Sequence, residues 1–237
     1  LAIENGFTIF EYKKNDINTF DEIIWSPGVP HSYPIPHPIA QEAKNVGVKI
    51  KSDIDLLFQG QNKASYYCIS GTNGKSTTTV MVAHILKNAG KNIQVGGNLG
   101  RAVLDLEPLG HDGIYILEIS SFQSELLQNF KPTISALLNI SPDHIDRHGS
   151  MDGYVNAKAQ LFKSQSQGSI AIINDDDEYC RNIKSMILRN SKLEVISISV
   201  DHKVTNGIFV ESNILKDSFF EKNYELDLSV FNHLHGR

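Results

Sequence analysis

The feature that most constrains this chain is a short glycine-rich loop between an apolar run and a helix-like run. Residues 65–70 predict a buried strand, and residues 76–88 predict a helix that ends before Gly90. The loop between them, residues 71–75, reads G-T-N-G-K. Glycines let backbone N–H groups turn toward an anion, and the start of the helix adds its positive end. This arrangement predicts a binding loop for nucleotide phosphates.

The loop is two residues shorter between its glycines than the commoner G-x-x-x-x-G-K-[ST] pattern, so a chance turn is the competing interpretation. The preceding strand and following helix favour the phosphate loop. We expect Lys75 to meet the β and γ phosphates of ATP and the Ser76 hydroxyl to bind Mg²⁺. The predicted ATP-binding residues are Gly71, Thr72, Asn73, Gly74, Lys75, Ser76 and Thr77.

The order of elements predicts an α/β fold with a doubly wound, mainly parallel sheet. Further strands are expected at residues 93–95, 113–119, 133–139, 169–174 and 193–199, and further helices at about 120–128, 152–163 and 176–188. Strands at 207–210, 224–228 and 230–234 would form a meander at one edge. Residues 1–58, with strands at 7–10, 22–25 and 48–50 and a helix at 38–45, suggest part of a Rossmann-like α/β domain. A linker is expected at 59–63, at the start of a second domain covering 59–237.

Composition excludes several classes of function. The formal net charge is -5 and no basic run is present, which argues against nucleic-acid binding. No apolar stretch reaches the length of a membrane span. The two cysteines, Cys68 and Cys180, give no disulfide framework and suit a reducing compartment. Because the chain opens with Leu1 and stops at Arg237, we interpret it as a fragment of a longer protein.

Polar residues gather at the predicted strand ends, where doubly wound sheets bind ligands. Glu118 ends an apolar strand, and a metal or a lysine would offset the cost of burying its charge. Ser120 and Gln123 follow on a turn into a helix, where Ser120 could simply be a helix cap. The run G-G-N-L-G at 96–100 is either a plain loop or part of the same edge.

The segment 141–148 reads S-P-D-H-I-D-R-H and concentrates two acids, two histidines and an arginine. A zinc site is one interpretation, since histidine and aspartate both bind zinc, although no cysteine lies nearby. A solvated turn is another. A second metal site or a substrate-phosphate site fits the strand-end position better.

Four ordered motifs resemble the Mur ligase family: S-G-T-N-G-K-S-T at 70–77, G-G-N-L-G at 96–100, L-E-I-S-S-F-Q at 117–123 and N-I-S-P-D-H-I-D-R at 139–147. The resemblance runs from about residue 20 to residue 237. It implies a partial N-terminal domain for a UDP-linked substrate (1–58) and a central ATP-binding domain (59–237) with an incomplete C-terminal end. The family's third domain, which binds the amino acid, and its motif for the adenine side are expected to be absent.

The resemblance also implies roles for individual residues. It places the first Mg²⁺ on Ser76 and Glu118, and the second on His144. Lys158, in N-A-K-A at 156–159, resembles the lysine that reacts with CO₂ to form a metal-binding carbamate. The implied catalytic residues are therefore Lys75, Glu118, His144 and Lys158. The implied substrate residues are Ser26, Pro27 and Gly28 toward the UDP, Asn98, Ser120 and His144 toward the muramoyl-alanine end, and Gln123 as a further substrate-binding residue.

The activity implied is an ATP-dependent, ADP-forming amide ligase of bacterial peptidoglycan precursor synthesis. The E-x-S-S-F-Q run favours the member that adds D-glutamate to UDP-N-acetylmuramoyl-L-alanine through an acyl phosphate. We expect a cytoplasmic monomer, and we expect this chain alone to bind nucleotide without ligating. Alternatives are a folylpolyglutamate-type ligase, a P-loop switch or motor NTPase, and a nucleotide-binding module without catalysis.

Overall fold

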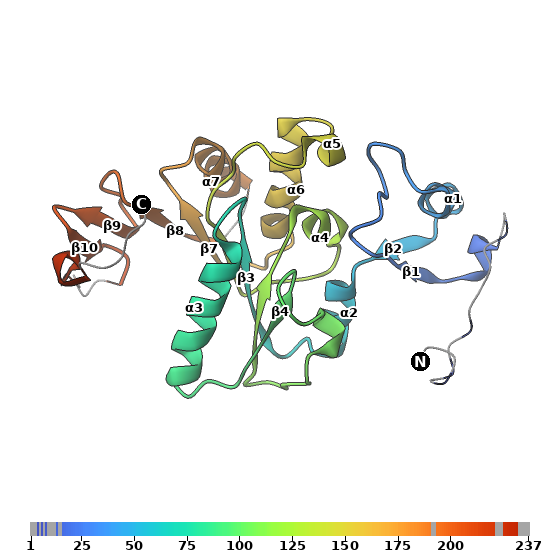
Figure 1. Cartoon of the computed structure of the whole chain (residues 1–237), viewed down its shortest axis with the longest axis horizontal. Helices are drawn as coiled ribbons and strands as arrows, with labels where there is room; N and C mark the ends of the chain where they lie inside the picture. The colour runs from blue at the N-terminus through green and yellow to red at the C-terminus, as the bar shows by residue number, and fades with distance from the viewer. Residues whose placement is uncertain are drawn as a thin grey trace.

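The structure is a computed structural model that describes residues 16–190, 193–220 and 225–231, together with residues 4, 6, 8 and 13. The described part contains a small two-stranded sheet and a large nine-stranded sheet. Figure 1 shows the small sheet beside α1, on the opposite side of the central helices from the β9–β10 end of the large sheet. We call these parts the first unit and the central unit.

The first unit is a parallel strand pair joined by a crossover helix. Strand β1 (Glu22–Ile24) pairs with β2 (Lys49–Lys51), and α1 (Pro38–Val46) connects them. Helix α1 begins with a proline and ends at Gly47, whose φ of 79° is left-handed and suits glycine. The sequence predicted all three elements. Of the expected strand at 7–10, the structure describes only residue 8, so that prediction lies outside the described residues.

The large sheet confirms the predicted doubly wound α/β architecture. Seven adjacent strands, from the edge strand to β9, are parallel, and β10 and β11 extend the other edge antiparallel. The order across the sheet is β11-β10-β9-β8-β7-β6-β3-β5-β4. The bounds are β3 Ser65–Ser70, β4 Ile93–Gly97, β5 Ile114–Glu118, β6 Ile134–Leu137, β7 Ile170–Asn174, β8 Glu194–Ser199, β9 Gly207–Glu211, β10 Ile214–Asp217 and β11 Glu225–Asp227.

The expected edge meander is correct in kind but wrong in detail. Strand β9 pairs parallel with β8 before the antiparallel hairpin begins, and β10 was not predicted. The expected strand at 230–234 begins inside a short 3₁₀ turn, Leu228–Phe231, and its remainder lies outside the described residues. A strand as short as β10, which reads I-L-K-D, carries too brief an apolar pattern to be recognised from sequence.

The two faces of the large sheet are covered unequally. Alternate residues of β3 point to opposite faces, with Tyr66 and Cys68 in the larger core and Ile69 in the smaller one. Helix α3 (Lys75–Asn88) covers the smaller core through Ala83. The larger core lies beneath α2 (Asp53–Gly60), α6 (Met151–Lys163) and α7 (Glu178–Asn190).

The expected linker at 59–63 is wrong for its first residues, because α2 continues to Gly60. Ser52 caps this helix, and Asp55 returns the bond to the Ser52 N–H. The buried Asp55 carboxylate also accepts hydrogen bonds from the N–H groups of Asn129 and Phe130, both 3.0 Å long. Helix α2 is therefore an integral part of the central unit.

The first unit contacts the central unit through α4 (Ser121–Leu126). Trp25 and Ala40 of the first unit form one apolar cluster with Leu126 of α4. Helix α4 also follows directly from the end of β5, at the edge of the sheet where ligands are expected. One short helix therefore joins the first unit to the predicted site.

Candidate functional site

The phosphate loop has the predicted strand–loop–helix geometry. It runs from β3 into α3, and Gly74 precedes the helix with a left-handed φ of 81° that favours glycine. The first N–H groups of α3 have no acceptor within the helix, so they are available to an anion. The Lys75 Nζ folds back and donates to the Thr72 carbonyl over 2.8 Å. A phosphate chain would compete for that amine.

Glu118, at the end of β5, connects two other predicted site residues. Its carboxylate is buried, and it accepts hydrogen bonds of 2.7 Å from both the Ser76 hydroxyl and the Asn98 amide. The turn that carries Asn98 approaches so closely that a Cβ on Gly97 would overlap the Glu118 carbonyl oxygen. Residues from β4, β5 and α3 therefore meet at one point, as their strand-end positions predicted.

Lys158 reaches the same region from α6. Its side chain is 2% exposed and its Nζ donates to the Gly71 carbonyl over 2.8 Å. The amine also lies 4.8 Å from the centre of the Tyr154 ring. Burial, and secondarily the charge of Lys75, lowers the pKa of Lys158 to about 7. A substantial fraction of this lysine is therefore an uncharged, nucleophilic amine near neutral pH.

His144 is placed less tightly than the other predicted catalytic residues. It precedes α5 (Ile145–His148) in a left-handed conformation with φ of 50°, and half of its side chain is exposed. Its Nε2 lies 3.4 Å from an Asp143 carboxylate oxygen, and its ring centre lies 4.9 Å from that of Phe122. Among the described residues, no group of three or more His, Cys, Asp or Glu is arranged to hold a metal. The zinc interpretation therefore gains no support from geometry.

Ser120 and Gln123 form the helix cap that was the simpler interpretation of Ser120. The Ser120 hydroxyl accepts from the Gln123 N–H over 3.2 Å, and the Gln123 Oε1 accepts from the Ser120 N–H over 3.0 Å. Ser26, Pro27 and Gly28 lie in the turn after β1, in the first unit. The substrate roles of these five residues remain predictions.

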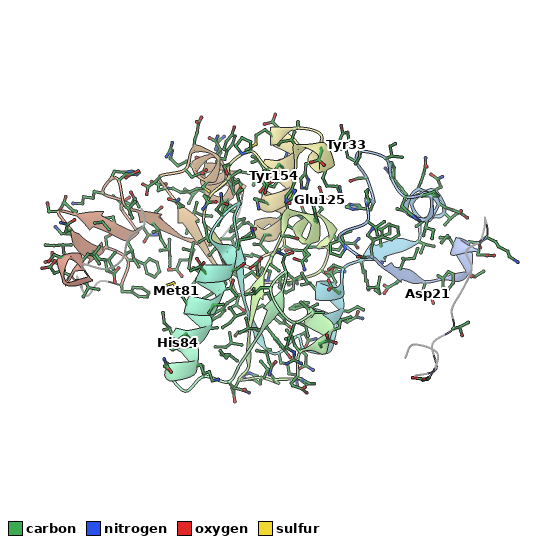
Figure 2. The ribbon with its side chains drawn as sticks, viewed as in Figure 1. Asp21, Tyr33, Met81, His84, Glu125 and Tyr154 are labelled. Atoms are coloured by element: carbon green, nitrogen blue, oxygen red, sulfur yellow. The ribbon has the colours of Figure 1, made fainter. Side chains whose placement is uncertain are left out.

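A cluster of charged and polar groups joins the first unit to α4 and α5, and we call it the Glu125 cluster: His31, Tyr33, Glu125, Arg147 and His148. The Glu125 carboxylate lies 2.6 Å from His148 Nδ1 and 3.4 Å from Arg147 Nη2. Arg147 also donates to the Tyr33 carbonyl over 3.0 Å. Figure 2 labels Tyr33 and Glu125 where the first unit approaches α4 and α5.

Burial sets the charge state of the two histidines in this cluster. It lowers the pKa of both His31 and His148, and this outweighs the opposing effect of the Glu125 carboxylate. Neutral His148 can then donate from Nδ1 to Glu125 and accept at Nε2 from the Ser121 hydroxyl, 3.0 Å away. No role for Glu125 was predicted, because its partners come from segments far apart in the chain.

Asn139 and Tyr154 are further residues whose contacts at the site were not predicted. The Asn139 carboxamide contacts the phosphate loop, and the Tyr154 hydroxyl lies 3.0 Å from the Thr72 hydroxyl. Asn139 stands inside the run 139–147, but its partners lie 66 and 67 positions earlier. We call residues 71–76 together with Asn98, Glu118, Asn139 and Lys158 the phosphate rim.

The fold and the phosphate rim define a doubly wound α/β protein with a glycine-rich loop between a parallel strand and a helix. Residues 69–234 match the model of the Mur ligase middle domain, and the chain belongs to the Mur ligase family. The part of the chain that the structure describes contains no helix long and apolar enough to cross a membrane.

Curated relatives are similar over most of the chain. A UDP-N-acetylmuramoylalanine–D-glutamate ligase from Paramagnetospirillum magneticum is 40% identical over 215 residues, covering 91% of this chain and 47% of that protein. The ligase of the same name from Rickettsia bellii is 41% identical over 201 residues, covering 85% and 43%. The chain spans about half the length of the curated relatives it matches.

Solved structures share the fold at low sequence identity. A UDP-N-acetylmuramoyl-L-alanyl-D-glutamate–2,6-diaminopimelate ligase matches with a TM-score of 0.57 at 19% identity, covering 79% of this chain and 49% of that chain. A murein peptide ligase from Psychrobacter arcticus matches with a TM-score of 0.54 at 15% identity, covering 95% and 52%. These matches support the α/β architecture over most of the chain.

Proposed function

We propose that this chain is the substrate- and ATP-binding part of a ligase that adds D-glutamate to UDP-N-acetylmuramoyl-L-alanine, with ADP and phosphate as the other products. The observation that carries the proposal is the meeting of Lys75, Glu118 and Lys158 around one phosphate loop, in a chain about 40% identical to ligases of that name. A switch or motor NTPase is disfavoured by the family match.

The residues of the phosphate rim suit a magnesium ion. The Ser76 hydroxyl and the Glu118 carboxylate present oxygen atoms 2.7 Å apart, and oxygen ligands from one or two protein groups are what nucleotide-bound Mg²⁺ prefers. When bound, Mg²⁺ would neutralise phosphate charge and polarise the γ-phosphoryl group. Asn98 fixes the other oxygen of Glu118, so the carboxylate is already oriented.

The proposed reaction brings two anions together, a substrate carboxylate and the γ-phosphate of ATP. Attack of the carboxylate oxygen on the γ-phosphorus breaks the bond to the ADP oxygen and gives an acyl phosphate. The amine of D-glutamate then attacks the acyl carbon, inorganic phosphate leaves, and the amine loses a proton. Lys75 and the first N–H groups of α3 would hold the phosphate chain and offset the repulsion in the first step.

Lys158 is proposed to form a carbamate with CO₂. Its uncharged amine would attack the carbon of CO₂ and lose one proton, so the side chain becomes an anion. The lowered pKa supports this step, because only the neutral amine is nucleophilic. The new carboxylate would add an oxygen ligand beside Gly71, where a second Mg²⁺, with His144, could be held.

The proposal is tested in two measurements. Calorimetric titration of this chain with ATP should show binding that requires Mg²⁺. The protein in its natural length should then release phosphate from ATP only when both UDP-N-acetylmuramoyl-L-alanine and D-glutamate are present, with L-glutamate as the control. Turnover of ATP without the carboxylate substrate would contradict the ligase and favour a simple NTPase. Binding of ATP without any turnover would reduce the proposal to a nucleotide-binding module.

A further inference from the structure

Asn139 makes an unusual number of contacts with the backbone of the phosphate loop. It lies two residues beyond the end of β6, which is the strand that pairs with β3. Its Oδ1 accepts hydrogen bonds from the N–H groups of Thr72 (3.1 Å) and Asn73 (2.8 Å), and its Nδ2 donates to the Asn73 carbonyl over 3.1 Å. The Asn139 carbonyl accepts a further bond of 2.9 Å from the Thr72 N–H. One side chain therefore holds both backbone groups of Asn73 and one of Thr72.

The Thr72 side chain extends this attachment beyond Asn139. Its hydroxyl accepts from the Ser141 N–H over 3.0 Å and lies 3.2 Å from the Ser141 carbonyl and 3.0 Å from the Tyr154 hydroxyl. Burial raises the pKa of Tyr154, so this phenol stays protonated and can share the bond. Hydrogen bonds thus connect Thr72 and Asn73 of the loop to residues 139–141 and to α6.

These contacts divide the donors of the loop into two groups. The N–H groups of Thr72 and Asn73 donate to Asn139 and are therefore already occupied. The N–H groups in the first turn of α3 have no acceptor within the helix and stay available. A loop with two glycines has many accessible conformations, so its shape must be imposed by neighbours.

We propose that Asn139 is a positioning residue for phosphate binding. It holds the phosphate loop in the conformation that presents Lys75 and the first turn of α3 to a triphosphate, without contacting the triphosphate itself. The inference rests on the proposed Mg-ATP site. It adds a residue that follows a neighbouring strand. Substitution of this residue should lower the affinity for the ligand and not only the stability of the fold.

A matched control stands on the next strand. Asn174 ends β7, and its Nδ2 donates to the Leu138 carbonyl over 2.8 Å while its Oδ1 accepts from the Asp176 N–H over 2.9 Å. The carboxamides of both asparagines thus form hydrogen bonds with backbone groups near the end of a strand. The hydrogen bonds of Asn174 go to Leu138 and Asp176, outside residues 71–76.

The experiment compares Asn139→Ala and Asn174→Ala in this chain. Calorimetry gives the Kd for Mg-ATP and for Mg-tripolyphosphate, which lacks the nucleoside, and thermal melting gives the Tm. We expect both variants to lower the Tm. Only Asn139→Ala should raise the Kd, by about tenfold or more and equally for the two ligands, because the lost contacts serve the phosphate chain.

Three outcomes would overturn the proposal in different ways. If Asn139→Ala lowers the Tm but leaves both Kd values within about twofold of the original, Asn139 is merely structural and the Mg-ATP site stands. If the unchanged chain binds neither ligand, the proposed function fails and this inference fails with it. Should Asn139→Ala not fold, Asn139→Leu keeps the branched shape of the side chain and removes the same side-chain hydrogen bonds. Tight binding by that variant would equally refute the role of Asn139.

Discussion

The phosphate rim and the Glu125 cluster both bury charged groups, but they satisfy them differently. In the rim, Lys75, Glu118 and Lys158 each form hydrogen bonds of 2.7–2.8 Å to protein atoms. In the cluster, several buried polar atoms have no hydrogen-bond partner among the described residues. They are His31 Nδ1, Glu125 Oε2, Arg147 Nε and Arg147 Nη2.

The two regions therefore differ in how completely their buried charged groups are hydrogen-bonded. In the rim, the Glu118 carboxylate and the Lys158 amine are already held by hydrogen bonds, as expected of a preorganised site. Lys75 would have to leave the Thr72 carbonyl to meet a phosphate. Buried polar atoms without a hydrogen bond cost free energy, and in the cluster this cost is offset in part by the ion pair of Arg147 Nη2 with Glu125 Oε2 at 3.4 Å. The charged groups of the rim are therefore held by hydrogen bonds, whereas those at the contact between the units depend partly on ion pairs without a hydrogen bond.

The largest effect is expected on the affinity for Mg-ATP, from a substitution in the phosphate rim. Lys75→Ala should raise the Kd for Mg-ATP roughly 100-fold, or about 3 kcal/mol, because a charge-assisted contact to phosphate is lost. The Tm should change little, since Lys75 only donates to the Thr72 carbonyl. Calorimetry and melting curves measure both values. Lys87→Ala is the control, because this exposed lysine lies in the last turn of the same helix.

The second prediction concerns the Glu125 cluster, where a substitution should lower the stability and leave the affinity for Mg-ATP almost unchanged. Glu125→Ala leaves the buried Arg147 without its carboxylate, so the free energy of unfolding should fall by about 2 kcal/mol, while the Kd for Mg-ATP stays within about twofold. Urea unfolding measures the stability change. Glu107→Ala removes an exposed acid 3.9 Å from Arg101 and should have almost no effect. A large change in Kd with Glu125→Ala would show that the two regions are not independent.

The smallest effect tests the buried lysine of the rim by its pH dependence. The pKa of Lys158 is about 7 in the fold and 10.5 in the unfolded chain, so between these values the unfolded state binds the extra proton. The original chain should therefore gain stability relative to Lys158→Met as pH rises, by about 1 kcal/mol between pH 7 and pH 8.

Melting curves in CO₂-free buffer would show this as a difference between the two proteins that changes with pH. The lost hydrogen bond to the Gly71 carbonyl adds an offset that does not depend on pH. Lys163→Met, at an exposed position on the same helix, is the control. A constant difference across the range would mean that Lys158 is charged in the fold.

Most of the central unit could be predicted from the sequence because its signals are local. The strand before the glycine loop, the helix after it and the parallel order of strands all follow from apolar runs and glycines. Helix α2 was missed although Ser52 and Asp55 have the spacing of a capping box, because the polar run that follows suggested a linker.

The site could be predicted only in part, because its remaining contacts connect distant segments. Glu118 and Ser76 were found because a charge after an apolar strand and a hydroxyl after a lysine are both conspicuous. Asn139 and Glu125 resemble ordinary polar residues of a turn and a short helix. Their importance lies in partners up to 94 positions away, such as the contact of Glu125 with His31.

Gly97 shows how a residue without a side chain can set the position of a neighbouring carboxylate, that of Glu118. Any larger residue there would collide with the Glu118 carbonyl oxygen and force the edge strand outward. Asn98 would move with it, and the Glu118 carboxylate would lose the amide that orients it. An engineer who wishes to alter the surroundings of the Glu118 carboxylate should therefore begin at Asn98 and leave position 97 alone.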